Sequence, residues 1–372
     1  MSALKSSARK RSRDGNNLLA RLAGRLEPNP MSLFPTPMLA TLIAEPFDNP
    51  AWIFEPKFDG LRILGRFDGK DITLLSRNNK TQNFQFPEIV DALSISLGMP
   101  AIVDGEVACL DESGRSSFRL LQQRFHLESA SEVQARREKY PAVIFLFDLL
   151  YLDSYDVTGL PLEERKRLLR KAVRWSDTVR WTEFQPEKGI HLWQEACEAG
   201  QEGIIGKHLQ SLYVSARSPN WVKIKCLGRQ EFVIGGFTDP QRSRVGLGAL
   251  LVGYYDDAGK RLIYAGKVGT GFTHEVLLDL RQRLDRLEQR SSPFDEGDPP
   301  RGAHTHWVRP QLVAEIAFGE WTQNSLLRQP RFEGLRPDKK PHQCRRERPQ
   351  PLHNGQSKAS QLVEKRPSKG KS

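Results

Sequence analysis

A lysine lies between two predicted strands, in the segment FEPKFDGLR at residues 54–62. Aromatic and β-branched residues at 52–54 and 61–67 favour strands on either side, so Lys57 is expected on a loop that a rigid scaffold holds. A free lysine titrates near pH ~10.4, and presenting it as a neutral amine at neutral pH costs about 4 kcal/mol. Burial beside aromatic neighbours, or cations brought close by the fold, would lower that cost. Lys57 is therefore a candidate nucleophile, although KFDG alone is more often a surface turn.

Two glutamates stand in strand-like segments that also contain glycine. Glu106 lies in VDGEV at residues 103–107, and Glu202 begins EGIIGKH at residues 202–208. A magnesium ion takes few protein carboxylates and leaves its remaining positions to water and phosphate oxygens. Glu106 and Glu202 would therefore suffice as protein ligands for a divalent ion that carries a triphosphate. Either residue alone is more often a solvated strand residue.

Two lysines alternate in the segment SPNWVKIK at residues 218–225. On a strand, Lys223 and Lys225 point to the same face. Two like charges side by side are costly without an anion between them, so the pattern predicts a face that binds phosphates. These cations would also depress the pKa of Lys57 if the fold brings them near it.

The order of these motifs resembles that of the covalent nucleotidyltransferases, a superfamily of ATP-dependent DNA ligases, RNA ligases and mRNA-capping enzymes. The resemblance extends over residues 55–339. It implies that Lys57 is catalytic and forms lysyl-AMP with ATP, and that Glu106 and Glu202 bind Mg²⁺ or Mn²⁺. It also implies ATP contacts for a wider set of side chains: Glu55, Asp59, Arg62, Arg77, Glu106, Phe147, Arg217, Lys223, Lys225 and Arg336.

The resemblance gives some of these residues specific roles. Phe147, in FLFDLLY at residues 145–151, is expected to stack on the purine, a contact worth roughly 1–3 kcal/mol. The bare pattern favours a buried strand, in which Phe147 belongs to the core. Arg336 and Lys339 are expected to contact the outgoing pyrophosphate. His208 departs from the family, in which arginine is frequent at this position, so its role stays open.

Segments at residues 228–236, 246–250 and 264–272 look most like the ligase component of bacterial ligase D, an end-joining enzyme. The resemblance implies a DNA ligase that seals 5′-phosphate/3′-hydroxyl breaks in nicked or broken duplex DNA, in DNA repair or end joining. A monomer in the bacterial cytoplasm is expected, with Ku as a candidate partner. Because 372 residues leave no room for the polymerase and phosphoesterase domains of ligase D, we expect a minimal ligase.

Two alternatives to a DNA ligase stay open. An RNA ligase or a GTP-using capping enzyme shares the first motif. A DNA end-binding protein with a dead active site would share the fold, although the intact set of lysines and glutamates argues against it.

The net charge of +11 is concentrated at the two ends of the chain. Residues 1–30 carry seven Lys or Arg against two acidic residues and residues 339–372 carry ten against two, so the chain between them has a net charge of −2. Flexible cationic tails would add salt-sensitive phosphate contacts to a nearly neutral core, and solvated ends without a partner are the alternative. No apolar run approaches the ~18 residues of a membrane helix. Four cysteines far apart in sequence suggest neither a zinc site nor a disulfide framework, and therefore a reducing compartment.

The strand and helix pattern predicts an α+β fold with two domains. The resemblance implies an adenylation (nucleotidyltransferase) domain of antiparallel sheets and helices over residues 31–228. Short strands separated by turns, with one helix at 273–289, predict an OB-fold β-barrel over residues 229–338. Residues 1–30 and 339–372 are expected to be flexible basic tails.

Overall fold

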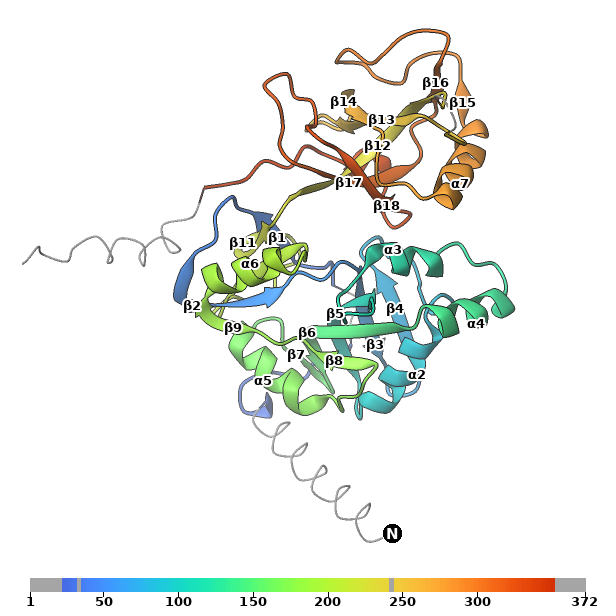
Figure 1. Cartoon of the computed structure of the whole chain (residues 1–372). Coiled ribbons are helices and arrows are strands. Elements are labelled where there is room, and N and C mark those ends of the chain that lie inside the picture. The colour runs from blue at the N-terminus through green and yellow to red at the C-terminus, as the bar shows by residue number, and fades with distance from the viewer. Residues whose placement is uncertain (1–21, 32–34, 241–243, 352–372) are drawn as a thin grey trace, which may run out of the picture. The chain divides into compact units, whose positions relative to one another are not determined.

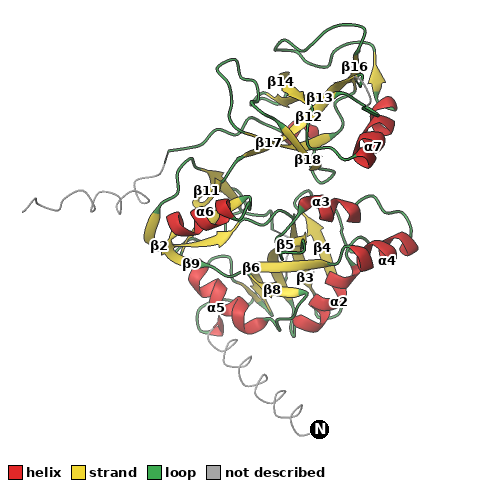
Figure 2. Cartoon of the chain, in the orientation of Figure 1, coloured by secondary structure: helices red, strands yellow, loops and turns green. Residues whose placement is uncertain are grey.

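The structure, a computed structural model, describes residues 22–31, 35–240 and 244–351. The chain forms two compact units, and it enters the second unit between Cys226 and Leu227, two residues before the predicted boundary. After Arg348 the chain returns to the first unit, where the Gln350 amide donates a hydrogen bond of 2.9 Å to the carbonyl of Leu42. Each unit has its own sheets and its own hydrophobic core (Figure 1, Figure 2). The expected mixed fold, dominated by sheets, is confirmed.

One sheet of the first unit contains the strand that precedes the candidate lysine and the strand that carries the lysine pair. Trp52, Ile53 and Phe54 on one of its strands are at most 2% exposed, so this strand is buried on both faces. The first strand runs parallel to its neighbour, and the other pairs are antiparallel. In spatial order the strands are β1 (Leu39–Leu42), β11 (Arg217–Lys225), β10 (Gly203–His208), β2 (Asp48–Pro56) and β9 (Gln185–Lys188).

The second sheet of the first unit is built around a long antiparallel pair. β5 (Ala101–Cys109) and β6 (Ala142–Leu152) form its centre, and both are almost wholly buried. A short strand, β8 (Val179–Trp181), pairs with β6 in parallel. The remaining strands extend the sheet on either side: β3 (Leu61–Phe67) and β4 (Ile72–Ser76) beyond β5, and β7 (Tyr155–Asp156) beyond β6.

Helices cover these sheets, and local sequence sets where two of them begin. Pro161 precedes α5 (Leu162–Ala172), whose buried leucines form one face. Ser129 and Glu132 form a capping box at the start of α4 (Ala130–Lys139). The other helical segments are α2 (Pro87–Ser96), α3 (Phe118–Leu121), the 3-10 turn η1 (Gln122–Arg124) and α6 (Gly189–Glu198).

The second unit is a barrel-like sheet of short strands, as an OB fold requires. A bridge between Thr270 and Arg331 brings the ends of the sheet together. The strands are β12 (Gly228–Thr238), β13 (Ala249–Tyr255), β14 (Leu262–Val268), β15 (Glu288–Gln289), β16 (Thr305–Val308), β17 (Val313–Phe318) and β18 (Arg331–Leu335). The expected OB-fold domain is confirmed.

A single long helix packs on this sheet. The side chain of Thr273 accepts a hydrogen bond from the Val276 amide and caps α7 (His274–Asp285). Leu277, Leu280 and Leu284 are buried against the barrel core, as their spacing predicts. Near the end of the unit, the chain forms a further 3-10 turn, η2 (Pro341–Gln343).

The described parts of both predicted tails are folded, so the prediction of flexible tails is wrong for them. Leu22 is 3% exposed in the core of the first unit, and the Asn29 amide donates a backbone hydrogen bond of 2.7 Å to that unit. Cys344 is 4% exposed in the second unit. Apolar contacts to the sheets overcome the polar composition of these segments. The remaining residues of 1–30 and 339–372 lie outside the described part of the chain.

A disulfide joins Cys197 in α6 to Cys226, so the expectation of unpaired cysteines is wrong. Their Cα atoms are 5.2 Å apart. The helix packs against β10 and β2, and this contact brings its last turn to the end of β11. A spacing of 29 residues in the sequence cannot show this proximity.

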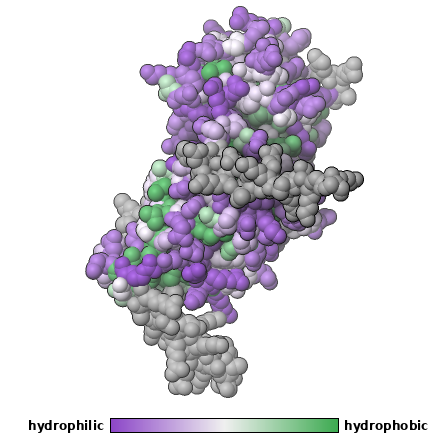
Figure 3. All heavy atoms as spheres, turned by 90° about the vertical axis from the view of Figure 1, so that its left-hand side faces the viewer, coloured by the Kyte–Doolittle hydropathy of each residue, from purple (hydrophilic) through white to green (hydrophobic). Residues whose placement is uncertain are grey.

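The surface is mostly hydrophilic on the face drawn in Figure 3, where apolar residues form small separate patches. In the part of the chain that is described, no helix combines the length and the apolar character needed to cross a membrane.

Candidate active site

Lys57 lies on the loop between β2 and β3, as predicted. Its backbone amide donates a hydrogen bond of 2.9 Å to the carbonyl of Gly203. Its ammonium group forms an ion pair with the carboxylate of Glu202, which immediately precedes β10. The side chains are 20% and 5% exposed, respectively, so this pair is largely shielded from water. Sequence analysis selected both residues but did not predict that they contact each other.

Gly203 makes this arrangement sterically possible. Its φ is +141°, a conformation that other L-residues rarely adopt. A Cβ atom at this position would lie 2.1 Å from the carbonyl oxygen of Ile224 on the neighbouring strand. Glycine therefore lets β10 approach β11 directly after Glu202.

The predicted ATP contact Asp59 ties the lysine loop to a second segment. Its amide donates to the Ser116 hydroxyl at 2.9 Å, and its carboxylate accepts from the Phe118 amide at 3.3 Å. Phe118 is the first residue of α3. Asp59 thus fixes the start of this helix beside Lys57.

Arg62 is held by a buried carboxylate that sequence analysis did not select. Its guanidinium donates to both oxygens of Asp104, at 2.5 and 2.6 Å. The Tyr213 hydroxyl donates to the same carboxylate at 2.7 Å and accepts from the amide of Met38 at 3.0 Å. Burial lowers the pKa of Arg62, but the charge of Asp104 outweighs it, so the pKa is raised and Arg62 stays charged. Asp104 stands two residues before the predicted site residue Glu106, and this position in the sequence could have marked it as part of the site.

Phe147, the predicted base platform, is 7% exposed and is covered by cations. The guanidinium of Arg62 lies 4.6 Å from its ring centroid, and the ammonium of Lys207 lies 4.1 Å from it. Phe145, two residues earlier on the same strand, is half-buried and stacks on Phe58 with centroids 4.0 Å apart. The structure thus leaves Phe145 as the more accessible ring, while Phe147 has the core position that the bare pattern favoured.

Glu55 is buried between two lysines that sequence analysis missed. Its carboxylate oxygens lie 2.5 Å from the ammonium of Lys166 and 2.6 Å from that of Lys207. Burial, followed by the nearby charge of Lys166, lowers the pKa of Lys207 to about 8, although Glu55 opposes this shift. Two buried ammonium groups therefore share one carboxylate. Lys207 follows the apolar residues IIG in the segment IIGKH, and this position could have indicated a buried lysine.

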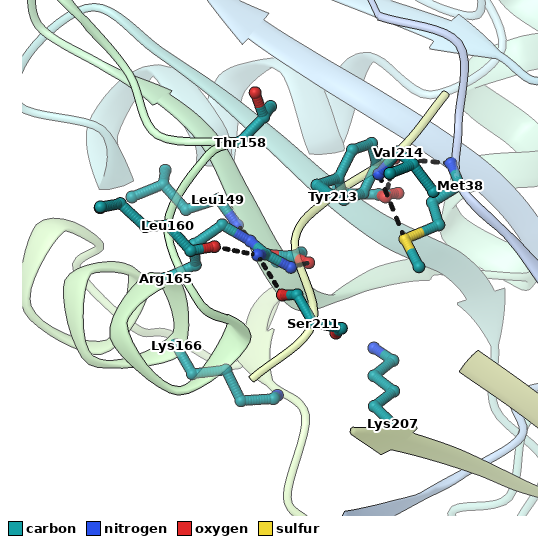
Figure 4. Close-up of polar contacts among 12 residues, drawn as sticks. Met38, Leu149, Thr158, Leu160, Arg165, Lys166, Lys207, Ser211, Tyr213 and Val214 are labelled. Carbon is teal, nitrogen blue, oxygen red and sulfur yellow. Dashed lines mark hydrogen bonds and ion pairs between the residues drawn. The ribbon is translucent and has the colours of Figure 1, made fainter. Parts of the chain in front are cut away.

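Lys166 and Lys207 come from different elements and extend toward each other (Figure 4). In the same view, Arg165 of α5 donates hydrogen bonds of 2.6 and 2.9 Å to the carbonyls of Leu160 and Ser211. Ser211 belongs to the segment that joins β10 to β11. This network fixes α5 and that segment around the polar cluster.

Strand register places the predicted phosphate-binding lysines on the same face as Glu55. Ile205 pairs with Glu55 on one side and with Lys223 on the other. Lys225 pairs with Gly203, two residues along, and so points the same way. In the other sheet, Glu106 pairs with Arg62 and with Phe145, which gives those three residues a common face. Both sheets thus present predicted site residues in register.

Two predicted ATP contacts lie on exposed parts of the first unit. Arg77 follows β4 in a turn that the Ser76 and Lys80 backbones close. Arg217 is exposed at the start of β11, and its guanidinium donates to the carbonyl of Ala40.

Arg336 lies in the second unit, inside a group of carboxylates. It donates to Asp338 at 2.9 Å and to Glu315 at 3.1 Å. Lys339 forms an ion pair with Glu231 at 2.7 Å. Burial lowers the pKa of Arg336, but these charges outweigh it and hold the pKa well above its ordinary value. Arg336 must leave these partners before it can contact a phosphate.

Glu106 and Glu202 fit a magnesium-type ion by their chemistry. Among the described residues, no group of three or more His, Cys, Asp or Glu side chains forms a closed metal site. Two carboxylates are enough when phosphate oxygens and water complete the coordination. The donor set therefore suits a metal that arrives with a nucleotide.

A lysine loop between two sheets, followed by an OB-fold barrel, defines the class of nucleotidyltransferases to which ligases belong. Residues 37–225 match the family described as "ATP dependent DNA ligase domain". Residues 243–339 match "ATP dependent DNA ligase C terminal region". The chain belongs to the ATP-dependent DNA ligase family, as its motifs predicted.

Relatives with similar sequences carry ligase names. Over 338 residues the chain is 40% identical to the multifunctional non-homologous end joining protein LigD of Pseudomonas aeruginosa, covering 89% of this chain but 39% of that protein. It is 33% identical over 326 residues to DNA ligase C1 of Mycolicibacterium smegmatis, covering 83% of this chain and 91% of that protein. The chain therefore spans about two fifths of the LigD relative and most of the DNA ligase C1 relative.

A solved structure described as mycobacterial DNA ligase D complexed with ATP and MES resembles the chain, with a TM-score of 0.62. The sequences are 34% identical, and the match covers 84% of this chain and 98% of that one. This similarity supports the expected kinship with the ligase component of ligase D.

Proposed function

We propose that the chain is an ATP-dependent DNA ligase that transfers AMP from ATP to Lys57 and then to the 5′-phosphate of a DNA break. The ion pair of Lys57 with Glu202 carries the proposal, because it sets an amine beside a carboxylate in a shielded position between two sheets. Family membership and the relatives named as DNA ligases support the same reaction.

Lys57 acts as the nucleophile in this proposal. Its carboxylate partner stabilises the ammonium form, whereas attack requires the neutral amine. Lys57 must therefore leave the ion pair with Glu202 and lose its proton. Its nitrogen then bonds to the α-phosphorus of ATP, the bond to the β-phosphate breaks, and pyrophosphate leaves. Mg²⁺ or Mn²⁺ held by Glu106 and Glu202 would stabilise charge on the phosphates.

The buried carboxylate of Glu55 is proposed to accept a hydrogen bond from the amino group of adenine. A carboxylate only accepts hydrogen bonds, and each oxygen has two lone pairs, so Glu55 can accept another donor while paired with its lysines. Adenine presents an amino group where guanine presents a carbonyl. Phe145 offers the accessible aromatic ring for stacking on the base. Arg62, through Asp104, and Asp59, through its contacts with the segment before α3, fix the segments around the proposed nucleotide site. Arg77 and Arg217 remain proposed nucleotide contacts.

The phosphates are proposed to bind the lysine pair of β11. Lys223 and Lys225 share the face of Glu55, and an anion between them would relieve their repulsion. Arg336 and Lys339 of the second unit are proposed to contact the departing pyrophosphate. For that step, both must exchange their carboxylate partners for phosphate.

The later steps use DNA. The AMP passes to a 5′-phosphate, and a neighbouring 3′-hydroxyl displaces it to seal the strand. The relatives named for non-homologous end joining support broken or nicked duplex DNA as the substrate. We propose Ku as the partner. A monomer acting in the bacterial cytoplasm completes the proposal.

One experiment tests the central step. The purified chain is incubated with α-labelled ATP and Mg²⁺, run on a denaturing gel, and chased with nicked duplex DNA. We expect label on the protein that moves into sealed DNA. Lys57→Ala should show no labelled adduct with the fold intact, whereas Lys70→Ala, at an exposed turn, should label normally.

Other outcomes would redirect the proposal. Labelling of Lys57→Ala would remove Lys57 as the nucleophile. Stronger labelling from GTP than from ATP would favour a capping enzyme, and transfer to nicked RNA alone would favour an RNA ligase. Wild-type protein that takes no label, once bound AMP has been removed, would favour a DNA end-binding protein. If added Ku does not change the rate at which broken ends are sealed, this result would count against Ku as a partner.

A further inference from the structure

The disulfide between Cys197 and Cys226 lies at the first of the two places where the chain crosses between the units. Cys226 is the last residue of the first unit. β11 ends at Lys225 and β12 begins at Gly228, so Cys226 and Leu227 alone connect these strands. The disulfide therefore anchors one of the two connecting residues to α6.

The other connecting residue has few contacts. Leu227 is 62% exposed, the second most exposed large apolar side chain after Ile95 in the described chain. Without the disulfide, Cys226 keeps a hydrogen bond of 3.1 Å from its amide to the carbonyl of Glu202 and its packing against the apolar cluster beneath α6. The covalent bond thus changes how firmly this junction is held.

We propose that Cys197 and Cys226 form a reversible oxidation site, at which a disulfide stiffens the junction between the two units and a dithiol frees it. The oxidant is a small-molecule disulfide such as oxidised glutathione. A thiolate of one cysteine attacks it, forming a mixed disulfide and releasing one small thiolate. The second cysteine thiolate attacks the protein sulfur of that mixed disulfide and releases the second. Two protein thiols are oxidised as one small disulfide is reduced to two thiols.

The surroundings of the four cysteines favour exchange at this pair. Cys197 and Cys226 are both half-buried, so a small thiol can approach them. Cys109 and Cys344 are buried, and burial raises the pKa of each thiol to about 12. They therefore hold little thiolate at neutral pH and compete poorly for a small disulfide.

The effect of the site on sealing rests on the proposed function. Lys57 belongs to the first unit and Arg336 to the second, so the proposed reaction needs side chains of both units at one nucleotide. In this proposal a stiff junction slows the approach of the two units to that nucleotide. We expect the oxidised protein to seal nicks more slowly, by roughly threefold to tenfold, since conformational steps limit turnover in many enzymes.

Thiol counting tests the oxidation site without any activity. The full chain is equilibrated with reduced or oxidised glutathione, alkylated under native conditions, and examined by mass spectrometry. We expect alkylation of Cys197 and Cys226 after reduction, no alkylation of either after oxidation, and full reversal on transfer between the two. Alkylation of both cysteines after oxidation, glutathione left attached to one of them, or a bond that reduced glutathione leaves intact would overturn the proposal.

Sealing rates test the control of the junction. Wild-type protein should seal nicked DNA faster after reduction, whereas Cys197→Ser should seal at the reduced rate under both conditions. Cys344→Ser keeps the pair and should respond as the wild type does. Equal sealing rates of the oxidised and reduced wild-type protein would refute the proposal that the disulfide controls sealing. If the protein takes no label from ATP in either state, the proposed ligase function is wrong. Thiol counting still shows whether Cys197 and Cys226 form a reversible oxidation site.

Discussion

The ammonium group of Lys57 and the carboxylate of Glu202 form an ion pair that links the loop after β2 to the start of β10. Glu202→Gln keeps the shape of the side chain and removes its charge. We expect lysyl-AMP formation to fall roughly 100-fold or more, because Glu202 is also a proposed ligand of the metal that would stabilise charge on the phosphates. Single-turnover labelling with α-labelled ATP measures this rate.

Glu195 supplies a matched control for that substitution. Its side chain is 60% exposed on α6. Glu195→Gln should label at the wild-type rate. An unchanged rate in Glu202→Gln would show that the ion pair is structural only.

Gly203 should not tolerate a side chain. Gly203→Ala places a Cβ atom 2.1 Å from the Ile224 carbonyl oxygen, at a φ of +141°. We expect a loss of stability of at least about 1–3 kcal/mol from the backbone conformation alone. We also expect loss of labelling, because β10 must shift and carry Glu202 with it. Thermal unfolding and labelling of the same preparation measure the two effects.

The control for this substitution is Gly98→Ala. A Cβ atom there meets no heavy atom within 4 Å. It should leave both the unfolding temperature and the labelling unchanged. A stable, active Gly203→Ala protein would contradict the steric argument.

Lys207 should make stability depend on pH in the alkaline range. Its folded pKa is about 8, below the unfolded value of 10.5. Between these values the unfolded chain binds a proton that the folded chain does not, so wild-type stability rises with pH. Below pH ~8 both forms are protonated, and the buried ammonium then costs up to about 3 kcal/mol.

Lys207→Met removes this charge and leaves Glu55 paired with Lys166. We therefore expect the variant to be more stable than wild type near pH 7, with the difference shrinking as the pH rises toward 10. Chemical denaturation at several pH values measures it, and Lys70→Met, at an exposed turn, should show no such trend. A difference that does not vary with pH would contradict a buried ammonium at this position.

His306 should make the stability of the second unit depend on pH near neutrality. Burial lowers its pKa, but hydrogen bonds to Glu288 at 2.8 Å and Asp239 at 2.9 Å outweigh burial, so the folded pKa is raised. A raised pKa gives stability that is complete below the unfolded value of ~6.5 and is lost as the pH rises through the folded value. His306→Gln should therefore lose most stability relative to wild type at acidic pH.

Thermal unfolding of the full chain from about pH 5.5 to 8 follows this difference across the histidine titration. His304 provides the comparison. Its side chain is 88% exposed, and its contact with Asp239, at 3.3 Å, is longer than that of His306. His304→Gln should follow the wild-type pH profile closely. A constant gap between His306→Gln and wild type would contradict the predicted pKa shift.

Strands with strong local patterns were predicted well from the sequence. β3 spans Leu61–Phe67, the bounds predicted for it. The helix predicted over residues 273–289 ends at Asp285, because the next residues form β15 and pair with β16. That pairing is a tertiary contact, and it overrides the leucine spacing.

Some interactions of the site could not be predicted from local patterns. Glu55 was selected as a nucleotide contact, but its buried partner Lys166 lies on α5, more than a hundred positions away in the sequence. Asp104 and Tyr213 likewise meet only in the folded chain. A pattern shows which residues can do chemistry, whereas their partners depend on which elements pack together.

The sequence by itself determined the ligase family, the order of the two domains and the candidate nucleophile Lys57, because short motifs fix residue type and local backbone shape. The tertiary structure alone decided which carboxylate faces that lysine, which lysines surround Glu55, and that Cys197 meets Cys226. These contacts join segments far apart in the chain. They form because burial of the sheets and helices sets the distances between segments, and no local pattern encodes those distances.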